Sequence, residues 1–99
     1  MRRGTTPTHI FKTKVDLTEA IEMFITYEQD GETVVEKSIE DITIEQEQLT
    51  VTLSQTDTLA FSTIGEVEIQ CRVKMPAGEA LASQIIKRPV GRILKEGII

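Results

Sequence analysis

The sequence has one cysteine, one histidine and no tryptophan, and these shortages exclude several classes of protein. A single thiol, Cys71, cannot close a disulfide within the chain, so packing must stabilise the fold, as is usual in a reducing compartment. One histidine, His9, without a cysteine cluster is not the ligand set of a zinc site. We therefore predict no metal and no cofactor, and expect His9 to be structural or simply exposed and Cys71 to be an inert core residue.

Long apolar runs and glycine-rich loops are missing as well. Hydrophobic residues make up 39% of the chain, but no stretch approaches the ~20 consecutive apolar residues that span a bilayer. Residues 4–8 are polar where a secretory signal would be apolar, so we expect synthesis in the cytosol and no membrane contact. The six glycines stand singly, which excludes a phosphate-binding loop. With no catalytic motif, we predict a protein that is not an enzyme.

The net charge of −5 is distributed unevenly along the chain. Residues 1–14 hold four basic residues and no acid, residues 87–99 hold four basic residues and one acid, and the other 15 acids lie between these ends. An acidic body argues against nucleic acid, because phosphate binding needs a basic face. The distribution describes either a solvated acidic domain with basic ends or a molecule whose positive end attracts its own copies or a partner protein.

Strict alternation of apolar and polar residues predicts strands over much of the chain. Three segments, 41–45, 49–53 and 66–75, alternate in this way, and the polar run 45–48 between the first two predicts a hairpin turn. The residues expected to face inward are Ile42, Ile44, Leu49, Val51, Leu53, Val67, Ile69, Cys71, Val73 and Met75.

A second hairpin is predicted around Asp30-Gly31, a dipeptide that accommodates the positive φ angles of a tight turn. Alternation before the turn places Ile21, Met23, Ile25 and Tyr27 inward, and residues 33–37 return. Phe24 breaks the alternation and is expected on the outer face, either as an isolated exposed side chain or as part of a contact surface.

The remaining segments complete the prediction. Residues 8–14 indicate a first strand with Ile10 or Phe11 inward, and the long segment after the turn at 76–78 favours a return strand over a helix. Ser54 followed by Asp57 predicts a short helical turn near 55–60. About seven strands in one domain, residues 1–99, are typical of an all-β, small antiparallel immunoglobulin-like β-sandwich, here without the disulfide and tryptophan of antibody domains.

The C-terminal segment 90–99 is unusually apolar and follows neither a strand nor a helix period. We expect Val90 and Leu94 to pack against the domain while Arg92 and the last two isoleucines face a partner. The candidate partner-binding residues are Arg88, Arg92, Ile93, Leu94, Ile98 and Ile99, together with Phe24.

Five segments resemble small, mostly uncharacterised proteins of Firmicutes and their prophages, and these segments are "RRGTTPTHIF", "ITYEQDGETVVEK", "LSQTDTLAF", "EIQCRVKMPAGEALAS" and "VGRIL". The similarity covers nearly the whole chain. Such proteins tend to be encoded among genes for phage tails and baseplates, and the N-terminal domains of some baseplate proteins have similar immunoglobulin-like folds. The resemblance implies a structural protein of a virion or tail, made in the bacterial cytoplasm, and it carries over no functional residue.

Two functions are compatible with these observations. The first is a phage structural or assembly module that binds copies of itself or a neighbouring tail protein. The second is a stand-alone binding module for a host protein or a carbohydrate. A carbohydrate site usually needs an exposed aromatic platform, so exposure of Phe24 and Tyr27 on one face would favour the second function and burial of both would oppose it.

Overall fold

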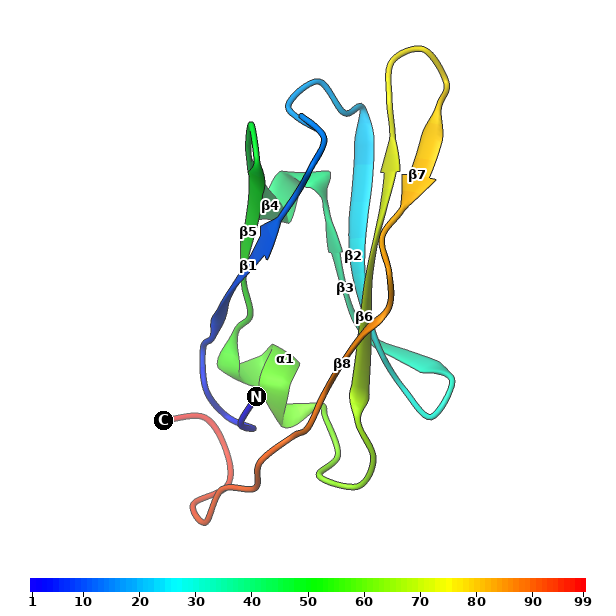
Figure 1. The fold of residues 1–99 in the computed structure, drawn as a ribbon. Coiled ribbons are helices and arrows are strands. Elements are labelled where there is room, and N and C mark those ends of the chain that lie inside the picture. Colours follow the sequence, from blue (N-terminus) through cyan, green and yellow to red (C-terminus); the bar gives the residue numbers. More distant parts are fainter.

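The computed structural model describes residues 1–99 as two antiparallel sheets that pack face to face (Figure 1). The smaller sheet has the strand order β1-β5-β4, and the larger has the order β3-β2-β6-β7, with β8 also paired to β6. The elements are β1 Thr8–Lys12, β2 Glu22–Gln29, β3 Glu32–Ser38, the 3-10 turn η1 Ile39–Asp41, β4 Ile42–Glu45, β5 Gln48–Thr52, α1 Gln55–Leu59, β6 Val67–Lys74, β7 Ala80–Ala82 and β8 Ile86–Arg88.

The strand order confirms the predicted all-β sandwich. It corresponds to strands B-E-D in one sheet and C′-C-F-G in the other sheet of an immunoglobulin-type domain, with β7 and β8 together taking the place of strand G. The predicted return strand is therefore correct, but it is interrupted at Ser83. Ser83 Oγ accepts a hydrogen bond of 3.0 Å from the backbone amide of Cys71, so a side chain replaces part of the ladder there. This interruption gives eight strands instead of about seven.

The core lies between the sheets and is built from alternate residues of their strands. The predicted inward residues of β5 and β6 are buried or half-buried, and Met23, Ile25 and Tyr27 of β2 have no exposed surface. In β1 the inward residue is Phe11, whereas Ile10 is exposed. The prediction for Ile21 is wrong: its side chain is 53% exposed because it lies in a bend before β2, where the strand no longer sets side-chain direction.

Local sequence signals set the turns. Asp30 and Gly31 both have positive φ, 52° and 78°, as a two-residue hairpin of the primed type requires. At the start of α1, the Asp57 amide donates to Ser54 Oγ over 3.0 Å and the Ser54 amide donates to Asp57 Oδ2 over 2.8 Å. The predicted helical turn and its reciprocal cap are thus confirmed.

Helix α1 connects the two sheets through polar contacts. Thr58 is fully buried and donates its hydroxyl to the carbonyl oxygen of Thr5 over 2.8 Å. Lys37 in β3 lies 2.8 Å from Asp57 Oδ2. Burial alone would raise the pKa of Asp57, but hydrogen bonds from Lys37 and Ser54 outweigh it and hold the pKa below its usual value. The helix is therefore fixed to the segment that leads into β1 and to β3 of the larger sheet.

Candidate interaction surface

The two basic ends of the chain meet at one end of the sandwich, beside α1 (Figure 1). The Gly91 amide donates to the carbonyl oxygen of Met1 over 2.7 Å, and the Arg3 amide donates to the carbonyl oxygen of Gly91 over 3.1 Å. The amino group of Met1 adds a bond of 3.0 Å to the carbonyl oxygen of Pro89. Residues 1–3 and 89–91 therefore run side by side, bonded through their backbones.

Arg3 joins the last residues to this end of the domain. Its Nε and Nη2 donate to the carbonyl oxygens of Phe61 and Leu59 over 2.8 and 2.9 Å, and its Nη1 donates to both carboxylate oxygens of Glu96. Leu59 ends α1, where carbonyl oxygens have no partner within the helix and a cation is favourable. One guanidinium group thus satisfies the helix end and holds the C-terminal segment.

The packing of the C-terminal segment differs from the sequence prediction at one residue. Val90 is buried as expected, but Leu94 is 89% exposed and the prediction that it packs against the domain is wrong. Ile93 is half-buried instead and takes the inward position: its Cδ1 atom lies only 2.8 Å from where a Cβ atom on Gly4 would stand. Since Ile93 fills this space, the next side chain, Leu94, is directed into solvent.

The exposed side chains at this end form what we call the tail surface, which consists of Arg92, Leu94, Ile98 and Ile99. Ile98 and Ile99 are 66% and 90% exposed, while the backbone of Ile99 is bonded to the Gln55 side chain in both directions, over 2.9 and 3.1 Å. Arg92 is exposed too, and its carbonyl oxygen accepts a bond from Arg2. Apolar side chains exposed together on a fixed backbone are typical of a contact surface.

The other two candidate residues are not part of the tail surface. Phe24 is on the outer face as predicted and is 37% exposed, but β2 begins at the opposite end of the sandwich (Figure 1). Arg88 lies in β8, and its charge acts on His9 in β1. The structure therefore exposes four of the seven candidates on the C-terminal segment, half-buries Ile93 against Gly4, places Arg88 in β8 just before the segment and places Phe24 towards the other end of the sandwich.

His9 is half-buried and links the smaller sheet to the larger. Its Nδ1 atom lies 2.7 Å from the hydroxyl oxygen of the buried Tyr27 in β2, a hydrogen bond that no local sequence pattern reveals. Burial lowers the pKa of His9, and the positive charges of the N-terminal amino group and Arg88 lower it further. Burial also raises the pKa of Tyr27, so both partners are favoured in their neutral forms.

We expect the free energy of unfolding to decrease as the pH falls from 7 to 5. The folded-state pKa of His9 is below the unfolded value of about 6.5, so the unfolded state takes up the proton first and gains relative stability below that pH. Urea unfolding at pH 7, 6 and 5 measures the effect. His9 is the single histidine, so the variant His9→Gln should have a flatter profile over this range. An equal slope in both proteins would contradict the assignment.

The side chains that carry reactive chemistry elsewhere are dispersed here. No three His, Cys, Asp or Glu residues are gathered closely enough to hold a metal ion. Cys71 is half-buried, and burial raises the pKa of its thiol to about 11, so the thiol is protonated and a poor nucleophile at neutral pH. None of the helices has the length and apolar character needed to cross a membrane.

Comparison with known proteins gives no match: nothing similar is found among protein-family models, curated proteins or solved structures. Function is therefore inferred from the exposed residues and contacts of this chain. The tail surface is the place where the sequence candidates and the structural features coincide. Arg3 and Gln55 hold the C-terminal segment by bonding to Glu96 and Ile99, which are 93 and 44 residues away along the chain. No local sequence signal therefore marks these contacts.

Proposed function

We propose that the protein is a non-enzymatic assembly module that binds its own copies or a neighbouring protein through the tail surface. The observation that carries this proposal is the exposure of Leu94, Ile98 and Ile99 on a backbone held by Arg3 and Gln55. Because the backbone of this segment is already ordered, binding a partner here costs less conformational entropy than binding that must first order a free segment. Burial of the exposed apolar area by the partner supplies the favourable free energy of binding.

The setting that we propose for the module is a phage tail or baseplate. This setting starts from the resemblance expected from the five sequence segments, for which the comparisons supply no relative, and the immunoglobulin-like strand order is compatible with it. The charge distribution is compatible with it, because the two basic ends of the chain meet at one end of a mostly acidic molecule. The basic end of one copy can attract the acidic part of another copy over about a Debye length.

The aromatic residues do not favour a carbohydrate site. Tyr27 has no exposed surface and points into the core, whereas Phe24 points outward from the same strand. The two rings therefore do not form the shared platform on which that alternative depends. We propose no second function.

A triple variant, Leu94→Ser, Ile98→Ser and Ile99→Ser, tests self-association through the tail surface. We expect the mass of the natural chain, measured by light scattering, to rise above 11.1 kDa with concentration, and that of the variant to stay near it. A matched variant, Ile10→Ser, Ile64→Ser and Ile85→Ser, removes three other exposed apolar side chains and should associate like the natural chain. A natural chain that is monomeric at every concentration would exclude self-assembly.

Stability measurements on the same proteins separate assembly from folding. The tail surface is exposed, and Glu96, 59% exposed, forms a surface ion pair with Arg3, so removing residues 94–99 should cost about 1 kcal/mol or less. A loss of several kcal/mol in the monomer would show that the segment belongs to the core and would contradict a contact role.

A further inference from the structure

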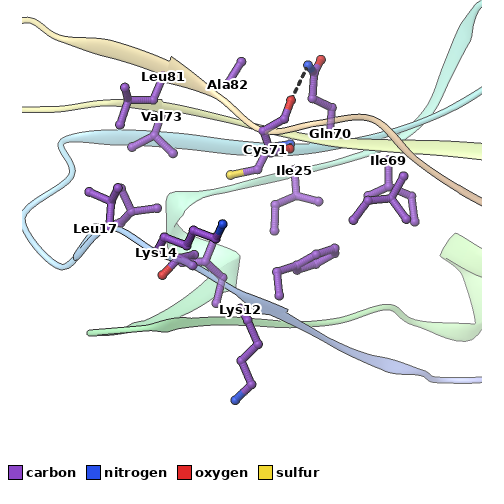
Figure 2. A pocket seen from close by; sticks show the side chains of 16 residues that line it. Lys12, Lys14, Leu17, Ile25, Ile69, Gln70, Cys71, Val73, Leu81 and Ala82 are labelled. Carbon is purple, nitrogen blue, oxygen red and sulfur yellow. Dashed lines mark hydrogen bonds between the residues drawn. The ribbon is translucent and has the colours of Figure 1, made fainter.

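A cavity of about 280 Å³ lies between the two sheets, on the side where β1 and β7–β8 form the edges (Figure 2). We call it the side cleft. Eleven of the 16 residues that line it are hydrophobic, among them Phe11 and Leu17 on one side and Leu81 and Ile86 on the other. The sulfur atom of Cys71 points into it (Figure 2). The side cleft exposes part of the interior of the sandwich.

The side cleft is open because no strand covers it. In an immunoglobulin-type domain strand A lies beside strand B, at the edge that β1 forms here. Residues 1–7 contribute a single parallel bridge, between Arg2 and Gly91, near the end that carries the tail surface. Beyond this bridge the edge of β1 has no neighbouring strand.

The free edge of β1 offers backbone groups to an added strand. The Leu53 amide donates to the Pro7 carbonyl and the Thr13 amide donates to the Glu47 carbonyl, so odd-numbered residues bond to β5 and its extension. Because hydrogen-bonding direction alternates along a strand, the amides and carbonyls of Ile10 and Lys12 point away from β5. Such an edge is what strand addition by a peptide uses.

The charges around the side cleft are of one sign. Lys12 and Lys14 lie among its lining residues, and no aspartate or glutamate does, although the chain has 16 acids. Lys14 is exposed, so its charge is available to a ligand, whereas the exposed Lys12 donates from Nζ to Gln48 Oε1 over 2.6 Å and points away from the side cleft (Figure 2). Thr13 Oγ1 on the same segment is the one buried side-chain oxygen or nitrogen atom without a hydrogen-bond partner. An occupant should therefore be apolar with acidic groups.

We propose that the side cleft is the docking site for an extended segment of a partner protein in which apolar residues alternate with acidic ones, added as a strand along β1. Alternate side chains of such a segment would enter the apolar cavity, and the acidic ones would lie near Lys14. The volume of 280 Å³ is slightly below the roughly 300–1,000 Å³ of small-ligand pockets, and it suits a few side chains better.

This site is distinct from the tail surface and goes beyond the proposed function. The C-terminal segment of a second copy is a poor occupant, because Arg92 and Lys95 would be brought beside Lys14. A separate acidic partner avoids this repulsion.

A pair of synthetic peptides tests the proposal. One alternates isoleucine with glutamate over about eight residues, a typical strand length, and the other has lysine in place of glutamate. We expect the glutamate peptide, followed by fluorescence anisotropy, to bind at least about tenfold more tightly than the lysine peptide. Because Cys71 is the single cysteine and lines the side cleft, the bound peptide should also slow its reaction with maleimide. Equal binding of both peptides, or no binding at about 1 mM, would overturn the proposal.

Charge reversal with a matched control locates the peptide. Lys14→Glu should weaken binding of the glutamate peptide by about tenfold, whereas Lys87→Glu, the same change in an exposed residue of β8 outside the lining, should change it less than about twofold. Leu81→Asp should abolish binding and Ile85→Asp, outside the lining, should not. Circular dichroism confirms that each variant is folded. Equal effects of the paired variants would overturn the proposal.

Other occupants would give different results. Protection of Cys71 by decanoate but not by the glutamate peptide would indicate a small amphiphile and overturn the proposal. Protection that rises with protein concentration without peptide would indicate a second copy and overturn it as well. The serine variant of the tail surface should bind the peptide normally, so failure of the tail-surface function and failure of the side-cleft proposal can be distinguished.

Discussion

Replacing Phe61 by alanine is expected to lower the free energy of unfolding by about 3–5 kcal/mol. Phe61 follows α1 and is 1% exposed, and its ring packs against Tyr27 with a centroid distance of 6.1 Å. The substitution leaves a cavity beside a second fully buried aromatic ring and removes that ring contact. A domain of 99 residues has a total stability of only about 5–15 kcal/mol, so the variant should be close to unfolding.

Phe24→Ala is the matched control, since the same atoms are removed from a side chain on the outer face of β2. We expect a smaller cost of about 1–2 kcal/mol, because this side chain is 37% exposed and its removal leaves no enclosed cavity. Urea unfolding of both variants measures the difference. Similar losses at the two positions would show that Phe61 does not contribute to the core as its burial indicates.

Replacing Asp57 by alanine is expected to cost about 2 kcal/mol, the second largest effect. The change removes the reciprocal cap with Ser54, which contributes about 1 kcal/mol, and the partly buried ion pair with Lys37, which adds a similar amount. Asp41→Ala is the control, because the Asp41 carboxylate accepts the Ser38 backbone amide at the start of η1 over 3.1 Å, as Asp57 accepts that of Ser54, and has no ion pair. Urea unfolding at pH 7 should give about half the loss for the control.

The difference in stability between the natural chain and Asp57→Ala should depend on pH. The folded-state pKa of Asp57 is below its unfolded value of about 3.9, so its contribution is complete above that pH and is lost as the pH falls through the folded-state pKa. The natural chain and Asp57→Ala should therefore converge in stability in acid. A difference that stays constant from pH 7 to pH 2 would contradict the role of the carboxylate.

Alternation along the chain predicted most of the sheet correctly because a strand has a fixed period of two. The period places Met23 and Phe24 on opposite faces whatever the neighbouring strands are, and the structure agrees. The same reasoning fails at Ile21, one residue beyond the strand, where the bend directs the side chain outward. Strand ends are set by tertiary contacts that the alternation does not contain.

Contacts between distant segments could not be predicted in the same way. Arg3 reaches residues 56 to 93 positions away, and His9 reaches Tyr27 across the two sheets, so no local pattern marks either pair. The cap between Ser38 and Asp41 is different, because its spacing equals that of Ser54 and Asp57 and was present in the sequence. The spacing of Ser38 and Asp41 is therefore a local signal from which the sequence alone predicts a turn.

The C-terminal segment shows the limit of composition as a guide. Ile93 and Leu94 are adjacent apolar residues without a period, and only the space beside Gly4 decides that the first packs inward and the second is exposed. No segment of the sequence predicts the side cleft either. It depends on what residues 1–7 leave uncovered, which is a property of the assembled sheets and not of any segment.

The backbone bonds between residues 1–3 and 89–91 bring the two ends of the sandwich sequence to a single point. A domain whose ends meet tolerates circular permutation, and the exposed Asp30-Gly31 turn is a suitable place for new ends. The same geometry allows the whole sandwich to be inserted into a surface loop of another protein with little strain on the host. The inserted domain would keep its fold and still present the side cleft.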